Sequence, residues 1–104
     1  MSTLKSTPAI KSTPAMLAKR YVVRGRVQGV GFRYFVERAA NSLELCGHVR
    51  NLDDGTVEVY AIGRTEQLNE LAGLLWKGPR TAEVRGVDEK DAPVQNCHGF
   101  STRG

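Results

Sequence analysis

Apolar and polar positions along the chain change their period several times, and each period predicts an element. From residue 20 to 27, apolar side chains alternate with polar ones, which is typical of a half-buried strand. Residues 45–51 and 56–62 are predicted as two more strands, joined by the turn Asp53-Asp54-Gly55. Between the first and second strands, apolar residues recur at helical spacing and predict an amphipathic helix over residues 32–43. These residues are Phe32, Phe35, Val36, Ala39, Ala40 and Leu43.

A second helix is expected after residue 64, with Thr65 as its N-cap and Gly78-Pro79 at its end. Its apolar stripe consists of Leu68, Leu71, Ala72 and Leu75. A fourth strand is predicted over residues 82–87, a loop over 89–98 and a short last strand over 100–103. The order β-α-β-β-α-β predicts an α+β ferredoxin-like sandwich, in which one antiparallel sheet carries both helices on one face. This layout hosts many unrelated functions, so function has to be argued from a site.

The first 18 residues differ in character from the rest. They contain two copies of a hexamer, residues 4–9 and 10–15, each with the sequence Lys-Ser-Thr-Pro-Ala after one apolar residue. The prolines prevent a continuous helix and few large apolar groups are present, so we expect residues 1–18 to form a mobile tail and residues 19–104 to form the domain. Of the formal net charge of +4, three charges come from lysines in residues 1–19. The domain itself is nearly neutral, which is unlike a domain built to coat nucleic-acid phosphates.

Composition excludes several classes of protein. The chain has 104 residues, 40% of them apolar and 25% charged, as expected for one small globular domain. No apolar run is long enough to span a bilayer and the first residues do not resemble a secretory signal, so we expect a cytoplasmic location without membrane contact. Cys46 and Cys97 are too few for a disulfide scaffold and lack zinc-site spacing. We expect two reduced thiols, although a single disulfide between them stays possible.

The stretch from residue 23 to 33 leads from the first strand through a glycine-rich turn into the first helix. The first amides of a helix have no partner within the helix, and Gly29 and Gly31 allow the backbone to curl so that these amides face one point. Such a concavity binds anions, and Arg33 in the first helical turn can add a guanidinium. The alternative is an ordinary strand-to-helix turn with one solvated arginine.

The second informative stretch runs from residue 47 to 63 and contains Asn51 where the second strand meets the hairpin turn. The Asn51 side chain carries both a donor and an acceptor, so it can orient a water molecule without a shifted pKa. Asparagine also commonly starts turns, and that simpler role is the alternative here.

Together the two stretches resemble the two signatures of the acylphosphatase family. Residues 23–33 fit the first signature at every defined position, and residues 47–63 fit the second at all but one, where His48 replaces an aromatic residue. Gly78-Pro79 also stands where the family has Gly-Pro, and the resemblance covers residues 19–104. A second departure is Glu44, at a position where the family commonly has glycine after the first helix. If that position is left-handed, the side chain costs about 1 kcal/mol.

The resemblance implies hydrolysis of the carboxyl-phosphate anhydride of acyl phosphates to a carboxylate and inorganic phosphate, without a metal, a cofactor or a covalent intermediate. It implies that Arg33 binds the phosphoryl group and that Asn51 holds the attacking water. It also implies that the loop amides help to bind phosphate. These amides belong to Gln28, Gly29, Val30, Gly31, Phe32 and Arg33.

The expected partners are a small-molecule acyl phosphate and inorganic phosphate, which is both product and competitive inhibitor, while nucleic acid and membranes are not expected. We expect a monomer. Small metabolites and phosphorylated aspartates on proteins are equally compatible as substrates. The first competing hypothesis is a non-catalytic ferredoxin-like module for RNA or an acidic partner, which would need exposed aromatic residues on the central strands. The second is a related domain that serves a larger carbamoyl-transfer protein; because nothing follows Gly104, we expect a free-standing enzyme instead.

Overall fold

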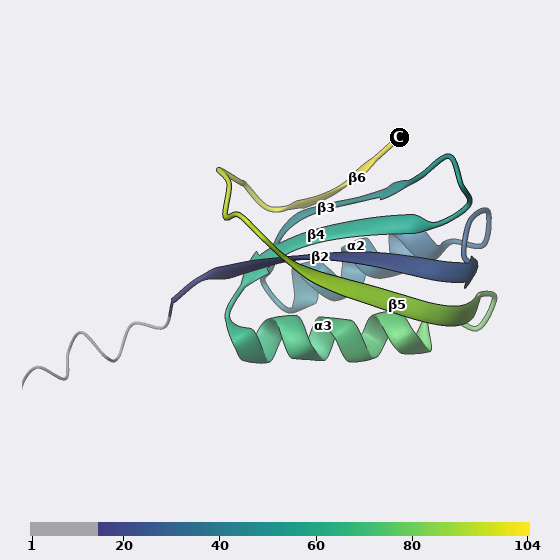
Figure 1. The fold of residues 1–104 in the computed structure, drawn as a ribbon, viewed down its shortest axis with the longest axis horizontal. Coiled ribbons are helices and arrows are strands. Elements are labelled where there is room, and N and C mark those ends of the chain that lie inside the picture. The colour runs from purple at the N-terminus through teal and green to yellow at the C-terminus, as the bar shows by residue number, and fades with distance from the viewer. Residues whose placement is uncertain (1–14) are drawn as a thin grey trace, which may run out of the picture.

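The computed structural model describes residues 15–104, so most of the predicted tail lies outside the described residues. Two helices lie on one face of a five-stranded sheet (Figure 1). The elements, in chain order, are β2 (Leu17–Arg26), α2 (Phe32–Ser42), β3 (Cys46–Asn51), β4 (Val57–Gly63), α3 (Thr65–Lys77), β5 (Glu83–Ala92) and β6 (Phe100–Arg103). The predicted ferredoxin-like α+β class is therefore confirmed. No helix of the described part is both long enough and apolar enough to cross a membrane.

The strand order in the sheet is β5-β2-β4-β3-β6. The first four strands pair antiparallel as predicted, but β6 pairs parallel to β3, so the sheet is mixed rather than wholly antiparallel. The prediction was wrong on this point because a four-residue strand carries no signal for its direction. The predicted loop over 89–98 was also partly wrong, since β5 continues to Ala92, which pairs with Ala18. The last residues of β5 are mostly polar because β5 lies at the edge of the sheet, so the sequence does not show a strand there.

The core lies between the sheet and the two helices. Alternate residues of the central strands point toward the helices, and the predicted helical stripes face them, so that these side chains are removed from water together. The fully buried large side chains are Tyr21, Phe32, Leu68, Leu71, Leu75, Val23, Val27, Val36, Val49, Val57 and Val59. The core therefore fixes the register of β2 and β3 relative to the start of α2, where the predicted site lies.

The helix ends agree with the sequence in one case and differ in another. Glu44 has a φ of 60°, the left-handed conformation that we anticipated for the position where glycine is common. The N-cap of α3 is Arg64 rather than the predicted Thr65, which is the first helical residue. Gln67 Oε1 accepts a hydrogen bond from the Arg64 backbone N–H at 2.8 Å and so takes over a capping role from within the first turn.

Cys46 and Cys97 form a disulfide, which corrects our expectation of two reduced thiols. Cys46 opens β3 and Cys97 precedes β6, and the parallel pairing of these strands brings the two Cα atoms to 5.9 Å. The two cysteines are 51 positions apart, and nothing in the sequence indicates that they lie close together. The bond therefore ties the start of the edge strand β6 to the body of the sheet.

Breaking this disulfide is expected to lower the free energy of unfolding by about 2–4 kcal/mol, because the crosslink restricts the unfolded chain across a long loop. Urea unfolding with and without reductant measures the effect. The Cys46→Ser/Cys97→Ser double variant is the control: it should match the reduced wild type, and reductant should not change it further. Equal stability of oxidised and reduced wild type would contradict the expectation.

Candidate active site

The turn between β2 and α2 has the shape that its glycines predict. Gly29 and Gly31 have φ values of 72° and 78°, a region that residues with a Cβ rarely enter, and Gly31 is the N-cap of α2. The first backbone hydrogen bond of the helix runs from Phe35 N–H to Gly31 C=O at 3.0 Å. Outside the helices and strands of residues 15–104, no hydrogen bond uses a backbone N–H of residues 28–33 as donor. These amides are therefore free to bind an anion, and the helix dipole adds to their partial positive charge.

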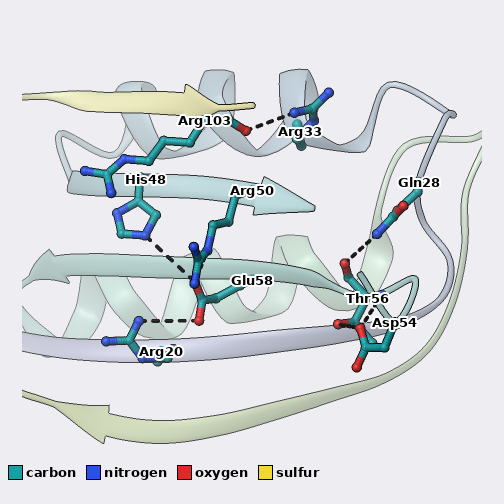
Figure 2. A network of polar contacts seen from close by, with 9 residues as sticks. All are labelled: Arg20, Gln28, Arg33, His48, Arg50, Asp54, Thr56, Glu58 and Arg103. Carbon is teal, nitrogen blue, oxygen red and sulfur yellow. Dashed lines mark hydrogen bonds and ion pairs between the residues drawn. The ribbon is translucent and has the colours of Figure 1, made fainter. Parts of the chain in front are cut away.

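Two side chains fix this turn from opposite sides. Gln28 Nε2 donates to the carbonyl oxygens of Leu52 and Thr56, both at 2.8 Å, and so ties the turn to the β3–β4 hairpin (Figure 2). Thr81 Oγ1 donates to Val30 C=O at 2.7 Å from the segment after α3. From the sequence, Gln28 was considered only for its backbone N–H, and Thr81 was not considered. Neither role has a local signal, because the partners lie 24 to 51 residues away.

Asn51 ends β3 and lines the same cavity as Gly29, Gly31 and Arg33. The cavity has a volume of about 360 Å³. Asn51 Oδ1 is buried and has no hydrogen-bond partner among the described residues. A buried acceptor is stabilised by a hydrogen bond, so this atom can accept one from a donor, such as water, that enters the cavity. The cavity thus brings together Gly29, Gly31, Phe32, Arg33 and Asn51 of the predicted site, whereas Gln28 and Val30 do not line it.

Arg33 projects from the first turn of α2 toward β6. Its Nη1 donates to the carbonyl oxygen of Arg103 at 2.9 Å, at the end of the chain (Figure 2). This bond holds the guanidinium beside the cavity and leaves its other N–H groups available. The C-terminal strand therefore takes part in positioning Arg33, a role that the weakly patterned sequence of residues 100–103 did not reveal.

Three further residues line the cavity and were not predicted: Tyr34, Glu37 and Thr102. Thr102 Oγ1 lies 3.0 Å from Glu37 Oε1, which accepts its hydrogen bond and is thereby held at the β6 side of the cavity. A carboxylate at this side repels anions and helps to confine the positive potential to the amides and Arg33. Tyr34 also lines the cavity and follows Arg33 directly in the first turn of α2.

His48 does not line this cavity. Side chains alternate along a strand, so His48 and Asn51 point to opposite faces of the sheet. On the face away from the helices, the His48 ring lies 5.5 Å from the Tyr60 ring. Near it the Glu58 side chain, only 10% exposed, accepts a hydrogen bond from Arg50 Nε at 2.7 Å and pairs with Arg20 at 3.5 Å (Figure 2). The structure therefore assigns His48 to packing on the open face of the sheet, one of the two roles considered for it.

Acid is expected to destabilise the fold through His48. Burial first, and then the positive charge of Arg103, lower the pKa of His48 from its ordinary value of 6.5. Below about pH 6.5 the unfolded chain binds a proton that the folded chain resists, so stability falls as the pH drops through that region. We expect the free energy of unfolding, measured by urea titration, to differ less between about pH 7.5 and about pH 5.5 in His48→Phe than in wild type. An undiminished difference would contradict this, and turnover should stay within about twofold because the ring is remote from the cavity.

The cavity combines free amides, one guanidinium and one unpaired amide oxygen. Amides and guanidinium suit the equatorial oxygens of a phosphoryl group, and the amide oxygen suits a proton of water. Within residues 15–104, no three side chains of His, Cys, Asp or Glu gather as a metal site would require. The arrangement can therefore bind a phosphoryl group and direct water to it.

Comparison with known proteins agrees with this chemistry. Residues 19–102 match the family model described as Acylphosphatase. An acylphosphatase of Solibacter usitatus is 55% identical over 86 residues, which cover 83% of this chain and 90% of that protein. The crystal structure of acylphosphatase from Bacillus subtilis has a TM-score of 0.82 and 37% identity, covering 85% of this chain and 99% of that one. The crystal structure of T. kodakarensis HypF is also similar, with a TM-score of 0.76 and 34% identity over 85% of this chain, but the match covers only 12% of that much longer chain.

Proposed function

This chain belongs to the acylphosphatase family, and we propose that within its reaction Arg33 and the amides of residues 28–33 hold the phosphoryl group while Asn51 orients the attacking water. The enzyme hydrolyses acyl phosphates to a carboxylate and inorganic phosphate. What remains to be assigned is the part that each residue plays in this activity.

Because the leaving group is a carboxylate, the site needs no general acid. A carboxylate has a conjugate acid with a pKa of about 4, so it departs without a proton from the enzyme. The barrier then depends on the charge spread over the three equatorial oxygens and on the alignment of water with the breaking P–O bond. A cavity lined by amides, Arg33 and Asn51 meets both needs without a general acid.

The observation that carries this proposal is the buried, unpartnered Oδ1 of Asn51 in the cavity beside Arg33. A water that donates one proton to this oxygen has its lone pair free to point at phosphorus. Gln28 supports the arrangement, because its two hydrogen bonds join the phosphate-binding turn to the hairpin that begins after Asn51. These hydrogen bonds support a constant distance between the phosphate-binding turn and Asn51, as the proposed alignment of phosphate and water requires.

The RNA-binding alternative is not favoured by the surface of the sheet. An RNA platform needs aromatic rings that bases can stack on. Tyr60, on the central strand β4, is 3% exposed, and its hydroxyl is used in a hydrogen bond to Pro93 C=O at 2.6 Å. His48 beside it is 13% exposed. These rings offer little surface for stacking.

Release of inorganic phosphate from benzoyl phosphate by the full chain tests the proposal. We expect steady turnover, competitive inhibition by added phosphate, which would occupy the same amides and Arg33, and no loss of activity after dialysis against EDTA. Loss of activity with the chelator, restored by a metal, would overturn the metal-free mechanism. Noncompetitive inhibition by phosphate would contradict the assignment of the cavity as the phosphate-binding site.

The monomeric state and the cytoplasmic location stay predictions. Size-exclusion chromatography tests the monomeric state.

A further inference from the structure

A second hollow adjoins the phosphate-binding cavity. It is a groove of about 480 Å³ between α2 and α3, which lie side by side on one face of the sheet (Figure 1). Gly31 and Tyr34 line both hollows, so the two are adjacent at the N-terminus of α2. Beyond them, the groove is lined mainly by apolar side chains, among them Phe35, Leu74 and Pro79.

The geometry of the reaction directs the leaving group to this side. In an in-line displacement, the attacking water and the departing oxygen lie on opposite sides of phosphorus. Asn51 holds the water near the end of β3, so the carboxylate leaves away from Asn51. An exit past Glu37 on the β6 side is disfavoured, because its carboxylate repels the developing charge of the product. Past Gly31 and Tyr34 lies the groove, whose lining in the described part of the chain includes no carboxylate.

Tyr34 has the properties of a residue that contacts a ligand at this exit. Its side chain is 63% exposed, although a large aromatic group stabilises a fold or a complex most when it is buried. The Arg38 guanidinium lies 5.6 Å from the centre of the Tyr34 ring and holds the ring at the rim by a cation–π contact. Arg38 also lines the groove and contributes positive potential on the side where the carboxylate departs.

We propose that the groove between α2 and α3 binds the acyl group of the substrate, with Tyr34 at the point where the phosphate site passes into it. This inference rests on the proposed function and adds a specificity site to it. The groove selects acyl phosphates whose acyl group is apolar and large enough to reach past Tyr34 to Leu74. A short acyl group such as acetyl ends before it reaches the groove walls.

Comparison of two substrates in the same variants tests the proposal. For wild type, kcat/KM is expected to be higher for benzoyl phosphate than for acetyl phosphate. In Tyr34→Ala and in Leu74→Ala, the ratio of the two kcat/KM values should fall by about tenfold, mostly through a higher KM for benzoyl phosphate. Trp76→Ala is the matched control: Trp76 is a 54% exposed aromatic residue of α3 that does not line the groove, and its removal should leave the ratio unchanged.

The outcomes separate this inference from the proposed function. If wild type releases phosphate from both substrates and neither groove variant changes the ratio, the acyl site is refuted and the phosphate site is unaffected. A fall in Tyr34→Ala alone would also refute it, because the acyl group would then end at the rim. An equal fall in Trp76→Ala would point to a general disturbance of α3, or to a docked partner, and not to acyl binding. If wild type releases no phosphate from either substrate, the proposed function itself fails.

Discussion

Arg33→Ala is expected to lower kcat/KM for an acyl phosphate by about 100-fold or more, because the variant loses the only side-chain cation placed beside the amide-lined cavity in the described residues. The amides of residues 28–33 stay in place, so the residual rate should remain above that of water alone. Phosphate should also bind more weakly to the variant. Steady-state phosphate release with benzoyl phosphate and inhibition by phosphate measure both effects.

Two further variants separate charge from geometry and from stability. Arg33→Lys keeps the charge but has no planar fork for two phosphate oxygens, so it should retain an intermediate rate. Arg85→Ala removes an exposed arginine of β5 that pairs only with Glu83, and turnover should not change. Arg33→Ala also loses the hydrogen bond to Arg103 C=O, which contributes about 0.5–1.5 kcal/mol, so it should still fold. Turnover of Arg33→Ala near the wild-type value would refute the assignment.

Asn51→Ala is expected to reduce kcat by about 100-fold, because water in the cavity loses the group that orients it. Inorganic phosphate should inhibit this variant almost as well as wild type, since the amides and Arg33 are unchanged. The free energy of unfolding should change by less than about 1 kcal/mol, because Asn51 Oδ1 has no hydrogen-bond partner among the described residues. A large loss of activity without a loss of stability separates a role in catalysis from a role in folding.

Urea unfolding and phosphate-release assays on the same preparations provide the two measurements. Asn69→Ala, at an exposed position of α3, is the matched control: it should leave turnover unchanged and raise the free energy of unfolding by no more than about 0.7 kcal/mol, through the helix propensity of alanine. Asn51→Asp keeps an acceptor but places a negative charge beside the phosphate, so it should weaken phosphate inhibition as well as turnover. A drop in stability of Asn51→Ala without loss of kcat would reverse the assignment and make Asn51 a structural residue.

The fold was largely predictable because its core follows simple periods. The stripes of both helices and the alternation in β2 are long enough to define their elements. The left-handed backbone at Glu44 was considered only because the family that the sequence resembles commonly has glycine at that position. The direction of β6 and the last residues of β5 were not predictable. Both lie at sheet edges, where exposed polar side chains hide the strand period and pairing depends on a distant partner.

In the site, too, some residues are recognisable from neighbouring sequence and others only from contacts with distant parts of the chain. The glycines of the turn and Arg33 directly after it stand in consecutive residues, so the sequence shows them as one local pattern. Gln28, Thr81 and Arg103 act on groups far along the chain, and the Cys46–Cys97 bond joins residues 51 positions apart. Contacts between residues far apart in the chain follow no fixed sequence spacing, so only the folded structure identifies them.

The two hydrogen bonds of Gln28 also affect how the site moves. A single side chain joins the turn before α2 to both ends of the β3–β4 turn, at Leu52 and Thr56, so we expect a displacement of either segment to carry the other with it. We therefore expect the thermal fluctuations of bound water and bound phosphate to be correlated, so that the separation between oxygen and phosphorus varies less than the position of each. Reactive alignment can therefore persist in a molecule of this size without a closing lid.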